Sequence, residues 1–386
     1  MYTRVCDLKT LSLKKSLFLF GPRSTGKSTL LKKLFGTNRY INLLKSDIFL
    51  RLSERPVVIR DIIKEIVEHG PGDEGPIIID EIQKLPILLD EVHDLIESQG
   101  IKFILTGSSA RKLRRSGVNL LAGRAWQANL FPLVYAEIPE FNLEKYLLYG
   151  GLPQVYSSQS PEEELDAYLN IYLKEEIKEE ALVQNFVNFS RFLKISALSN
   201  AKQINYSNIS QETGVPVTTV RAYFEILSDT FVGFTLEPWH ESKKRKAVSA
   251  AKFYFFDIGV ANYLNGRKVI NRNSDDFGEA FEHWMAMELR AYLSYQRIKE
   301  PLTYWRTTSK EEVDFIIGNK VAIEVKSTTK VLEKHLKGLK RLAEEGIIQC
   351  LFLVSFDEIE TKTSDGVRTI HWKNFINDLW TGKIIS

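Results

Sequence analysis

A segment near the start of the chain combines glycines, a lysine and hydroxyl side chains in an order that suits phosphate binding. The glycines let backbone N–H groups curl around an anion, and a helix that starts here would direct its positive dipole end at that anion. Lys27 would reach the β- and γ-phosphates of a nucleotide, and Ser28 would hold Mg²⁺. We therefore predict an ATP site at Gly21, Arg23, Ser24, Thr25, Gly26, Lys27, Ser28 and Thr29.

The elements predicted around this segment place it between a strand and a helix. An apolar run at residues 17–20 precedes it, and apolar residues at helical spacing follow it from Leu30 to Phe35. Strand, glycine-bearing turn and helix form the context that distinguishes a phosphate-binding loop, or P-loop, from a chance match.

An acidic pair, Asp80 and Glu81, follows three apolar β-formers at residues 77–79. Such a run suits a strand buried on both faces of a parallel sheet, and these sheets bind ligands at the carboxyl ends of their strands. In this Walker B interpretation, Asp80 would hold the Mg²⁺ shell and Glu81 would orient or deprotonate the attacking water. An ordinary acidic turn is the alternative.

Two further segments offer groups for the same reaction. The apolar residues 103–105 lead into Thr106 and Ser108, whose hydroxyls would contact a γ-phosphate or position water, or would instead cap the next helix. Arg124 follows a turn at residues 121–123. It would neutralise transition-state charge across a subunit interface, or else form a surface salt bridge.

A second group of candidate residues lies on a β-hairpin predicted at residues 311–326. A three-residue turn at residues 318–320 makes one face apolar and sets Asp314 opposite Glu324, with Cβ atoms about 5 Å apart. A divalent cation would remove the repulsion between the two carboxylates, and Lys326 on the same face could activate a water or stabilise charge. A two-residue turn would set Asp314 against Ile323, so the hydrophobic pattern itself selects the metal-site register.

Flanking segments add to this candidate metal site. A helix that opens at residues 277–282 could contribute Glu282, or Glu279, as another carboxylate. After the hairpin, one helical stripe is basic, at Lys330, Lys334, Lys337 and Arg341, and another is apolar, at Leu332, Leu336, Leu339 and Leu342. A basic stripe beside carboxylates and a metal fits a phosphodiester backbone. An exposed, salt-bridged hairpin beside a solvated helix is the alternative.

The middle of the chain is predicted to be helical. Residues 161–181 suit one long helix, and residues 206–213 and 217–227 suit two helices around a turn at Gly214. Strand-like segments at 232–238 and 252–256 flank the basic residues 243–246, as in a winged helix whose wing contacts DNA. Such a domain would bind DNA through phosphates, with Arg221 on its second helix, or would serve as a protein–protein module.

The whole chain limits the class of protein. Its 386 residues are enough for two or three domains, and a net charge of +3 does not by itself predict nucleic acid. Two cysteines exclude a disulfide framework and a cysteine-based zinc site, which fits a cytoplasmic protein. We expect no signal peptide and no membrane span.

Together these residues resemble a family. The P-loop, residues 79–81, 106–109 and 122–124 are similar to AAA-type ATPases of bacteria and archaea, and Asp314 with residues 324–326 is similar to the PD-(D/E)XK nuclease superfamily, although Val313 stands where that motif has proline. The whole order, including residues 150–153 and 257–261, resembles a group of uncharacterised ATPases that joins the two. The resemblance implies an α/β fold with a P-loop ATPase domain at 1–135, a helical and winged-helix domain at 136–268, and a nuclease-like domain at 269–386.

The resulting hypothesis is an ATP-dependent protein that acts on DNA. Mg²⁺ would serve the ATPase, with Glu81 and Arg124 as catalytic residues. Asp314, Glu324 and Glu282 would hold Mg²⁺ or Mn²⁺ at the second site, with Lys326 as its catalytic residue. An ATP-controlled switch or scaffold without nuclease activity is one alternative, and a transcription regulator is another. Arg124 acting in trans would require a homo-oligomer.

Overall fold

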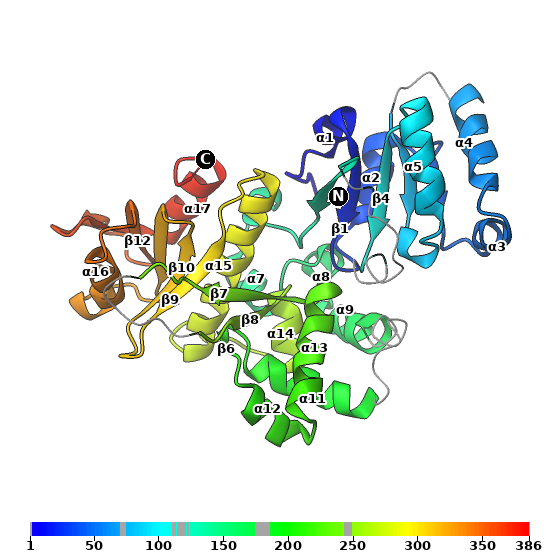
Figure 1. Cartoon of the computed structure of the whole chain (residues 1–386). Helices are drawn as coiled ribbons and strands as arrows, with labels where there is room; N and C mark the ends of the chain where they lie inside the picture. The colour runs from blue at the N-terminus through cyan, green and yellow to red at the C-terminus, as the bar shows by residue number, and fades with distance from the viewer. Residues whose placement is uncertain are drawn as a thin grey trace. The chain divides into compact units, whose positions relative to one another are not determined.

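The computed structural model describes residues 2–69, 75–109, 113, 121, 123–173, 186–242 and 249–385. The chain separates into two compact units, one made of Met1–Pro132 with Asp229–Val232 and the other of Leu133–Ser228 with Gly233–Ser386. Most of the first unit is coloured from blue to cyan in Figure 1, and the second continues to red at the C-terminus. Both combine helices with sheet, so the expected mixed α/β class is confirmed.

The first unit is built on a parallel sheet in the order β2-β3-β4-β1-β5. Strands β1, β3 and β4 are buried along their whole length, as expected for continuous apolar runs between two helical layers. The strands are β1 (Ser16–Phe20), β2 (Tyr40–Asn42), β3 (Ile77–Asp80), β4 (Phe103–Gly107) and β5 (Ala125–Asn129). The helices are α1 (Leu8–Lys14), α2 (Lys27–Phe35), α3 (Ser46–Glu54), α4 (Val58–His69) and α5 (Leu88–Gln99).

The second unit contains a mixed sheet in the order β13-β14-β12-β11-β10-β9-β7-β8-β6. Its strands are β6 (Lys202–Gln203), β7 (Gly233–Pro238), β8 (Lys252–Phe255), β9 (Leu302–Arg306), β10 (Glu312–Ile317), β11 (Val321–Val325), β12 (Cys350–Ser355), β13 (Thr361–Lys362) and β14 (Val367–His371). Strands β7 and β9 pair in parallel and join the hairpin of the middle region to the C-terminal strands. The domain boundary that we placed at residue 268 therefore lies inside one sheet, and the three-domain division stays a prediction.

Helices cover this sheet and form the middle region. They are α7 (Leu143–Tyr149), α8 (Pro153–Ser157), α9 (Pro161–Ala167), α11 (Phe186–Leu198), α12 (Tyr206–Thr213), α13 (Val217–Asp229), α14 (Ile258–Leu264), α15 (Asp275–Tyr295), α16 (Lys337–Ala343) and α17 (Trp372–Trp380). The single helix expected at residues 161–181 is instead α9 followed by a π-helix, Tyr168–Leu173, and its remainder lies outside the described residues.

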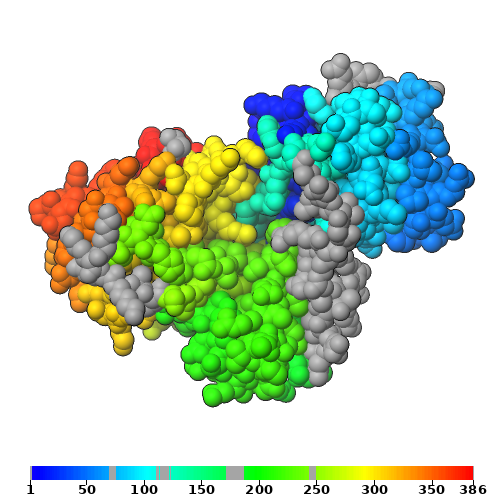
Figure 2. All heavy atoms as spheres, in the orientation of Figure 1, coloured from blue at the N-terminus to red at the C-terminus, as the bar shows by residue number. Residues whose placement is uncertain are grey.

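The middle region has the helix pair and the hairpin that the sequence predicts. Gly214 takes a left-handed conformation between α12 and α13, and Val220, Tyr223 and Leu227 face inward. Strands β7 and β8 then pair antiparallel. Helices α11 to α13 lie on the surface of the second unit, where they are green in Figure 2. The basic residues 243–246 lie outside the described residues.

The two glycine-bearing motifs of the middle region meet in the structure. The Asp257 carboxylate caps α14 and also accepts a hydrogen bond from the Gly151 backbone N–H at 2.8 Å. A Cβ at Gly259 would lie 2.0 Å from the carbonyl oxygen of Tyr149. Close packing of α14 against the end of α7 therefore requires both a small residue and a buried acceptor.

Candidate functional site

The P-loop connects β1 to α2 as the sequence predicts. Gly21 has a φ of +147°, and a Cβ there would lie 2.3 Å from the Leu130 carbonyl oxygen, so only glycine fits. Gly26, in a left-handed conformation, precedes the first residue of α2, Lys27. Lys27 Nζ donates to the carbonyl oxygens of Gly21 at 2.7 Å and Pro22 at 2.8 Å. The ammonium is thus held inside the curve of the loop, where a phosphate would be bound.

Arg4 supports the loop from outside, which sequence reasoning missed. Its guanidinium donates to the carbonyl oxygens of Thr25 at 2.7 Å and Phe131 at 2.6 Å. It therefore ties the P-loop to the segment that follows β5. No motif marks a supporting arginine so far from the loop in sequence.

Asp80 ends β3 and gathers three hydroxyl donors. The Ser28 hydroxyl donates to one carboxylate oxygen at 2.9 Å, and Tyr40 from β2 donates to the same oxygen. Thr106 from β4 donates to the other. The Ser28 hydroxyl in the first turn of α2 therefore lies beside the Asp80 carboxylate at the end of β3. Mg²⁺ prefers oxygen ligands, so these two groups fit a role in holding the ion.

Glu81 is held by its own set of contacts. Its backbone N–H donates to the Thr106 hydroxyl at 3.0 Å, and its carboxylate accepts a hydrogen bond from Gln83. The same Gln83 amide group lies 3.3 Å from the Ser108 hydroxyl. Thr106 and Ser108 thus contact the acidic segment after β3. Most of residues 110–120, where a capped helix would lie, are outside the described residues.

Arg124 forms an ion pair with Glu97 of α5, and 36% of its side chain is exposed. This contact is the surface salt bridge that was one of the two alternatives for Arg124. Its other role, neutralising transition-state charge across a subunit interface, stays a prediction. Ala122 and the basic residues at positions 111, 112, 114 and 115 lie outside the described residues.

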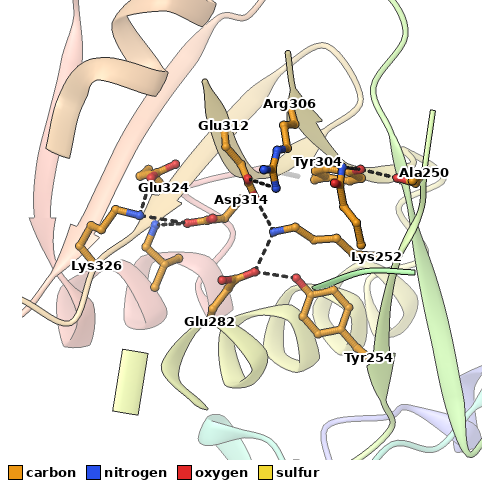
Figure 3. Close-up of polar contacts among 12 residues, drawn as sticks. Ala250, Lys252, Tyr254, Glu282, Tyr304, Arg306, Glu312, Asp314, Glu324 and Lys326 are labelled. Atoms are coloured by element: carbon orange, nitrogen blue, oxygen red, sulfur yellow. Dashed lines mark hydrogen bonds and ion pairs between the residues drawn. The ribbon is translucent and has the colours of Figure 1, made fainter. Parts of the chain in front are cut away.

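The second site is the β10–β11 hairpin of the second unit (Figure 3). Phe315 pairs with Ile323 and Ile317 with Val321, so the register predicted from the hydrophobic pattern is confirmed. Asp314 and Glu324 are only 5% and 6% exposed. The structure therefore places the two carboxylates in the protein interior rather than on an exposed, solvated hairpin.

Lys326 lies beside both carboxylates. Its Nζ is 2.5 Å from Glu324 Oε1 and 4.0 Å from Asp314 Oδ2. Asp314 Oδ2 also accepts a hydrogen bond from the backbone N–H of Val325 at 2.8 Å. Glu324 Oε2 is buried and has no hydrogen-bond partner. An unpaired buried carboxylate oxygen beside a second carboxylate fits a cation ligand.

The charges in this site shift one another's protonation. Burial, followed by the negative charge of Asp314, raises the pKa of Glu324 to about 8. Burial alone would lower the pKa of Lys326, but Asp314 and Glu324 raise it above its ordinary value. The lysine therefore stays charged and partly neutralises the pair. Among the residues that the structure describes, no group of three or more His, Cys, Asp or Glu side chains is arranged to hold a metal.

Glu282, rather than Glu279, belongs to this cluster. Glu282 Oε1 accepts hydrogen bonds from Lys252 Nζ at 3.0 Å and from the Tyr254 hydroxyl at 2.8 Å. Glu279 instead pairs with Lys202 at 2.8 Å and Arg267 at 2.7 Å. Sequence reasoning missed Lys252 and Tyr254, although they alternate on a strand that it predicted.

The expected basic stripe is less regular than predicted. Residues 333–336 form a 3₁₀-helix before α16, and Leu332, expected to face inward, is 45% exposed because it precedes both. Arg341 pairs with Glu344 at 2.9 Å. In the helix pair, the Arg221 guanidinium lies 4.0 Å from the centre of the Tyr206 ring and so stacks on its own domain.

Comparisons with known proteins agree with the ATPase domain predicted for the first part of the chain. Residues 13–139 match the family model of an AAA domain, so the chain carries an AAA-type P-loop ATPase domain. Residues 140–270 and 277–375 match two domains of unknown function, DUF8612 and DUF4143.

Several similar curated proteins have names that describe them only as uncharacterized. Proteins from Mycobacterium bovis and Mycobacterium tuberculosis are each 25% identical over 324 residues, which cover 81% of this chain and 70% of theirs. One from Methanocaldococcus jannaschii is 25% identical and covers 68% of this chain and 66% of its own.

A solved structure gives a weaker match. It is a signal transduction ATPase with numerous domains and a tetratricopeptide repeat sensor, from Pyrococcus horikoshii, and it is 18% identical. The match covers 78% of this chain and 50% of that one, with a TM-score of 0.24.

No helix in the described ranges is long and apolar enough to cross a membrane.

Proposed function

We propose that the AAA domain binds Mg·ATP and hydrolyses it with the side chains of the P-loop and of the Asp80–Glu81 pair. The observation that supports this is the meeting of Ser28, Asp80 and Thr106 through hydrogen bonds beside the P-loop. Lys27 would exchange loop carbonyl oxygens for the β- and γ-phosphates. Ser28 and Asp80 would hold Mg²⁺, and the ion would supply positive charge to the phosphate oxygens.

The attacking water is assigned to Glu81. Its carboxylate would orient the water or take its proton, and Thr106 fixes its backbone by accepting its N–H. Ser108 is placed near Glu81 through Gln83 and would contact the γ-phosphate or the water.

The test is phosphate release from ATP by three variants. Lys27→Ala should lose both ATP binding and hydrolysis. Glu81→Gln should keep ATP binding but hydrolyse about a hundredfold or more slowly, the usual contribution of a general base. Lys33→Ala, which changes an exposed lysine on the same helix, is the matched control. Wild-type turnover in Glu81→Gln would overturn the assignment.

A second candidate function concerns the second unit. We propose that Asp314 and Glu324 hold a divalent cation, Mg²⁺ or Mn²⁺, and that the site acts on the phosphodiester backbone of DNA. The orphaned Glu324 Oε2 favours this over a structural ion pair alone. The ion would polarise a phosphate and supply a nucleophilic water. Lys326 would stabilise charge beside it, and the helix pair with its β7–β8 hairpin would contact DNA phosphates as a winged helix.

The test uses linear, circular, single-stranded and branched DNA with Mg²⁺ or Mn²⁺, with and without ATP. Cleavage lost in Lys326→Ala but kept in Lys27→Ala would identify a nuclease whose ATPase is regulatory. Loss in both variants would mean ATP-driven cleavage. No cleavage by the wild type, together with ATP hydrolysis that Lys27→Ala abolishes, would favour an ATP-controlled switch or scaffold.

A further inference from the structure

A lysine from outside the β10–β11 hairpin enters the carboxylate cluster. Lys252 begins β8, and only 4% of its side chain is exposed. Its Nζ lies 3.0 Å from Glu282 Oε1 and 2.7 Å from Glu312 Oε1. Figure 3 shows this ammonium between the two carboxylates. It therefore links three elements, β8, α15 and β10, at a single buried point.

The chain's own donors occupy this side of the cluster. The Tyr254 hydroxyl, two residues along β8, donates to Glu282 Oε1 at 2.8 Å. Arg306 from β9 lies 3.1 Å from Glu312 Oε2. The Lys252 ammonium also lies 5.2 Å from the centre of the Tyr304 ring. Glu282 and Glu312 are thus both engaged by cationic or hydroxyl donors.

The other side of the cluster differs. Lys326 contacts Glu324 Oε1, but Glu324 Oε2 is buried without a partner. Buried anions require compensation, and here one carboxylate oxygen lacks it. The side of the cluster that suits a cation is therefore the one formed by Asp314 and Glu324, and not the one formed by Glu282 and Glu312.

The balance of charge in the cluster also favours a single divalent cation. Four carboxylates, Glu282, Glu312, Asp314 and Glu324, meet three cations, Lys252, Arg306 and Lys326. Once a cation displaces the proton that the raised pKa keeps on Glu324, one negative charge is left over, so one divalent cation suffices to compensate it. A second would need Lys252 to leave, because like charges in a buried site repel each other.

We infer that Lys252 is a built-in cation that fills the Glu282–Glu312 side and so limits the cluster to one divalent cation, at Asp314 and Glu324. The inference rests on the proposed divalent-cation site. Glu282 is then a fixed acceptor for β8 rather than an open metal ligand. Because β8 is the second strand of the hairpin that follows the helix pair, that region supplies a positioning residue of the metal site.

The experiment counts the Mn²⁺ ions bound by the full chain without nucleotide, by electron paramagnetic resonance of free Mn²⁺ and by calorimetry. The wild type should bind one ion that Asp314→Asn and Glu324→Gln abolish and that Glu282→Gln leaves in place. Lys252→Met should bind two, because the vacated position is lined by Glu282 and Glu312. Lys252→Arg, which keeps the cation, is the matched control and should bind one.

The two proposals fail in different ways. Both proposals would be overturned if the wild type bound no ion whose binding depends on Asp314 and Glu324, and if Lys252→Met bound no ion either. One ion in the wild type and still one in Lys252→Met would overturn the role of Lys252 alone. If Lys252→Met does not fold, as judged by thermal unfolding, Glu282→Gln decides: loss of the wild-type ion there would make Glu282 a ligand and overturn the inference.

Discussion

Asp80 accepts hydrogen bonds from hydroxyl groups on three different elements, α2, β2 and β4. Its side chain is only 2% exposed, and a buried carboxylate needs such donors in place of water. Burial, and then the hydrogen bond to Asp80, raise the pKa of Tyr40 well above its ordinary value. Tyr40 therefore remains a donor at any physiological pH and helps to keep Asp80 in place.

Thr106 allows a test of this arrangement at the scale of a single residue. Replacing Thr106 with valine keeps its shape but leaves Asp80 one donor short and the Glu81 N–H without its acceptor. We expect the free energy of unfolding to fall by about 2 kcal/mol, the cost of a buried unsatisfied polar group. ATP turnover should fall as well, because Glu81 loses its backbone anchor.

The matched control is Thr106→Ser, which keeps the hydroxyl and removes only a methyl group. Urea unfolding followed by circular dichroism, with steady-state ATP hydrolysis on the same samples, would compare the two variants. Equal stability and turnover in Thr106→Val and Thr106→Ser would show that the hydroxyl is dispensable.

Sequence reasoning named Asp80, Glu81 and Thr106, but it named neither Tyr40 nor Gln83. The named residues follow apolar runs that mark the ends of buried strands, and a parallel sheet brings those ends together. Tyr40 lies within a short strand, and what its side chain contacts depends on which strand pairs with it. The whole sheet determines that pairing, so no pattern in the nearby sequence indicates the contact with Asp80.

At the scale of elements, the hairpin of β10 and β11 was predicted in full. Alternating apolar residues on both strands allow only one register that keeps a face apolar, and the turn length follows from it. The parallel pairing of β7 with β9 was not predicted, because about sixty residues separate the two strands and no turn connects them. The contact of Lys252 with Glu312 is not predicted either, because it too joins residues that lie far apart in the sequence.

Helix α15 carries a buried carboxylate that makes stability depend on pH. Glu288 is fully buried and accepts hydrogen bonds from the Tyr135 N–H at 2.8 Å and from the indoles of Trp284 at 3.1 Å and Trp380 at 2.9 Å. Burial outweighs these donors and raises its pKa from 4.5 to about 8. The folded chain therefore binds this proton more tightly than the unfolded chain does.

The sign of the effect follows from linkage. Stability from the Glu288 proton is fully present below pH 4.5 and is lost as the pH rises towards 8. Each unit of pKa difference corresponds to about 1.4 kcal/mol. Glu288→Gln cannot ionise, so its deficit in melting temperature relative to wild type should be largest near pH 5 and should shrink by pH 8.5.

Thermal unfolding at several pH values would measure this, and taking the difference from wild type removes the contribution of other groups such as Asp257, whose pKa burial raises to about 6. Glu163→Gln, on an exposed part of α9, is the control and should show a deficit near zero throughout. A Glu288→Gln deficit that stays constant with pH would contradict the prediction.

At the scale of the whole molecule, contacts divide the chain into two units, while family models match residues 13–139, 140–270 and 277–375 separately. The predicted ATP-site residues lie wholly in the first unit and the carboxylate cluster lies wholly in the second. Sequence motifs assigned each site to its region, because the P-loop and the β10–β11 hairpin each hold several of the site residues within a short stretch of chain. The links that bind the middle region to the last one are long-range and came only from the structure.

Assembly of several chains is the remaining prediction at this scale, and Arg124 tests it. Within one chain Arg124 pairs with Glu97, an exposed contact that costs little to break. If copies assemble so that Arg124 reaches a neighbour's ATP, turnover per chain should rise with protein concentration. Arg124→Ala should then lower kcat by about a thousandfold or more, as loss of a trans-acting arginine does. Glu97→Gln, which removes this ion pair, should retain activity.

Mixing two inactive variants separates a trans-acting arginine from a structural one. Lys27→Ala cannot use ATP but keeps Arg124, whereas Arg124→Ala keeps its P-loop but lacks the arginine. In mixed assemblies, the first variant would supply Arg124 to the ATP site of the second, so phosphate release should reappear on mixing and peak at intermediate ratios. Two inactive variants that stay inactive at every ratio, with assembly verified by light scattering, would confine Arg124 to its surface pair with Glu97.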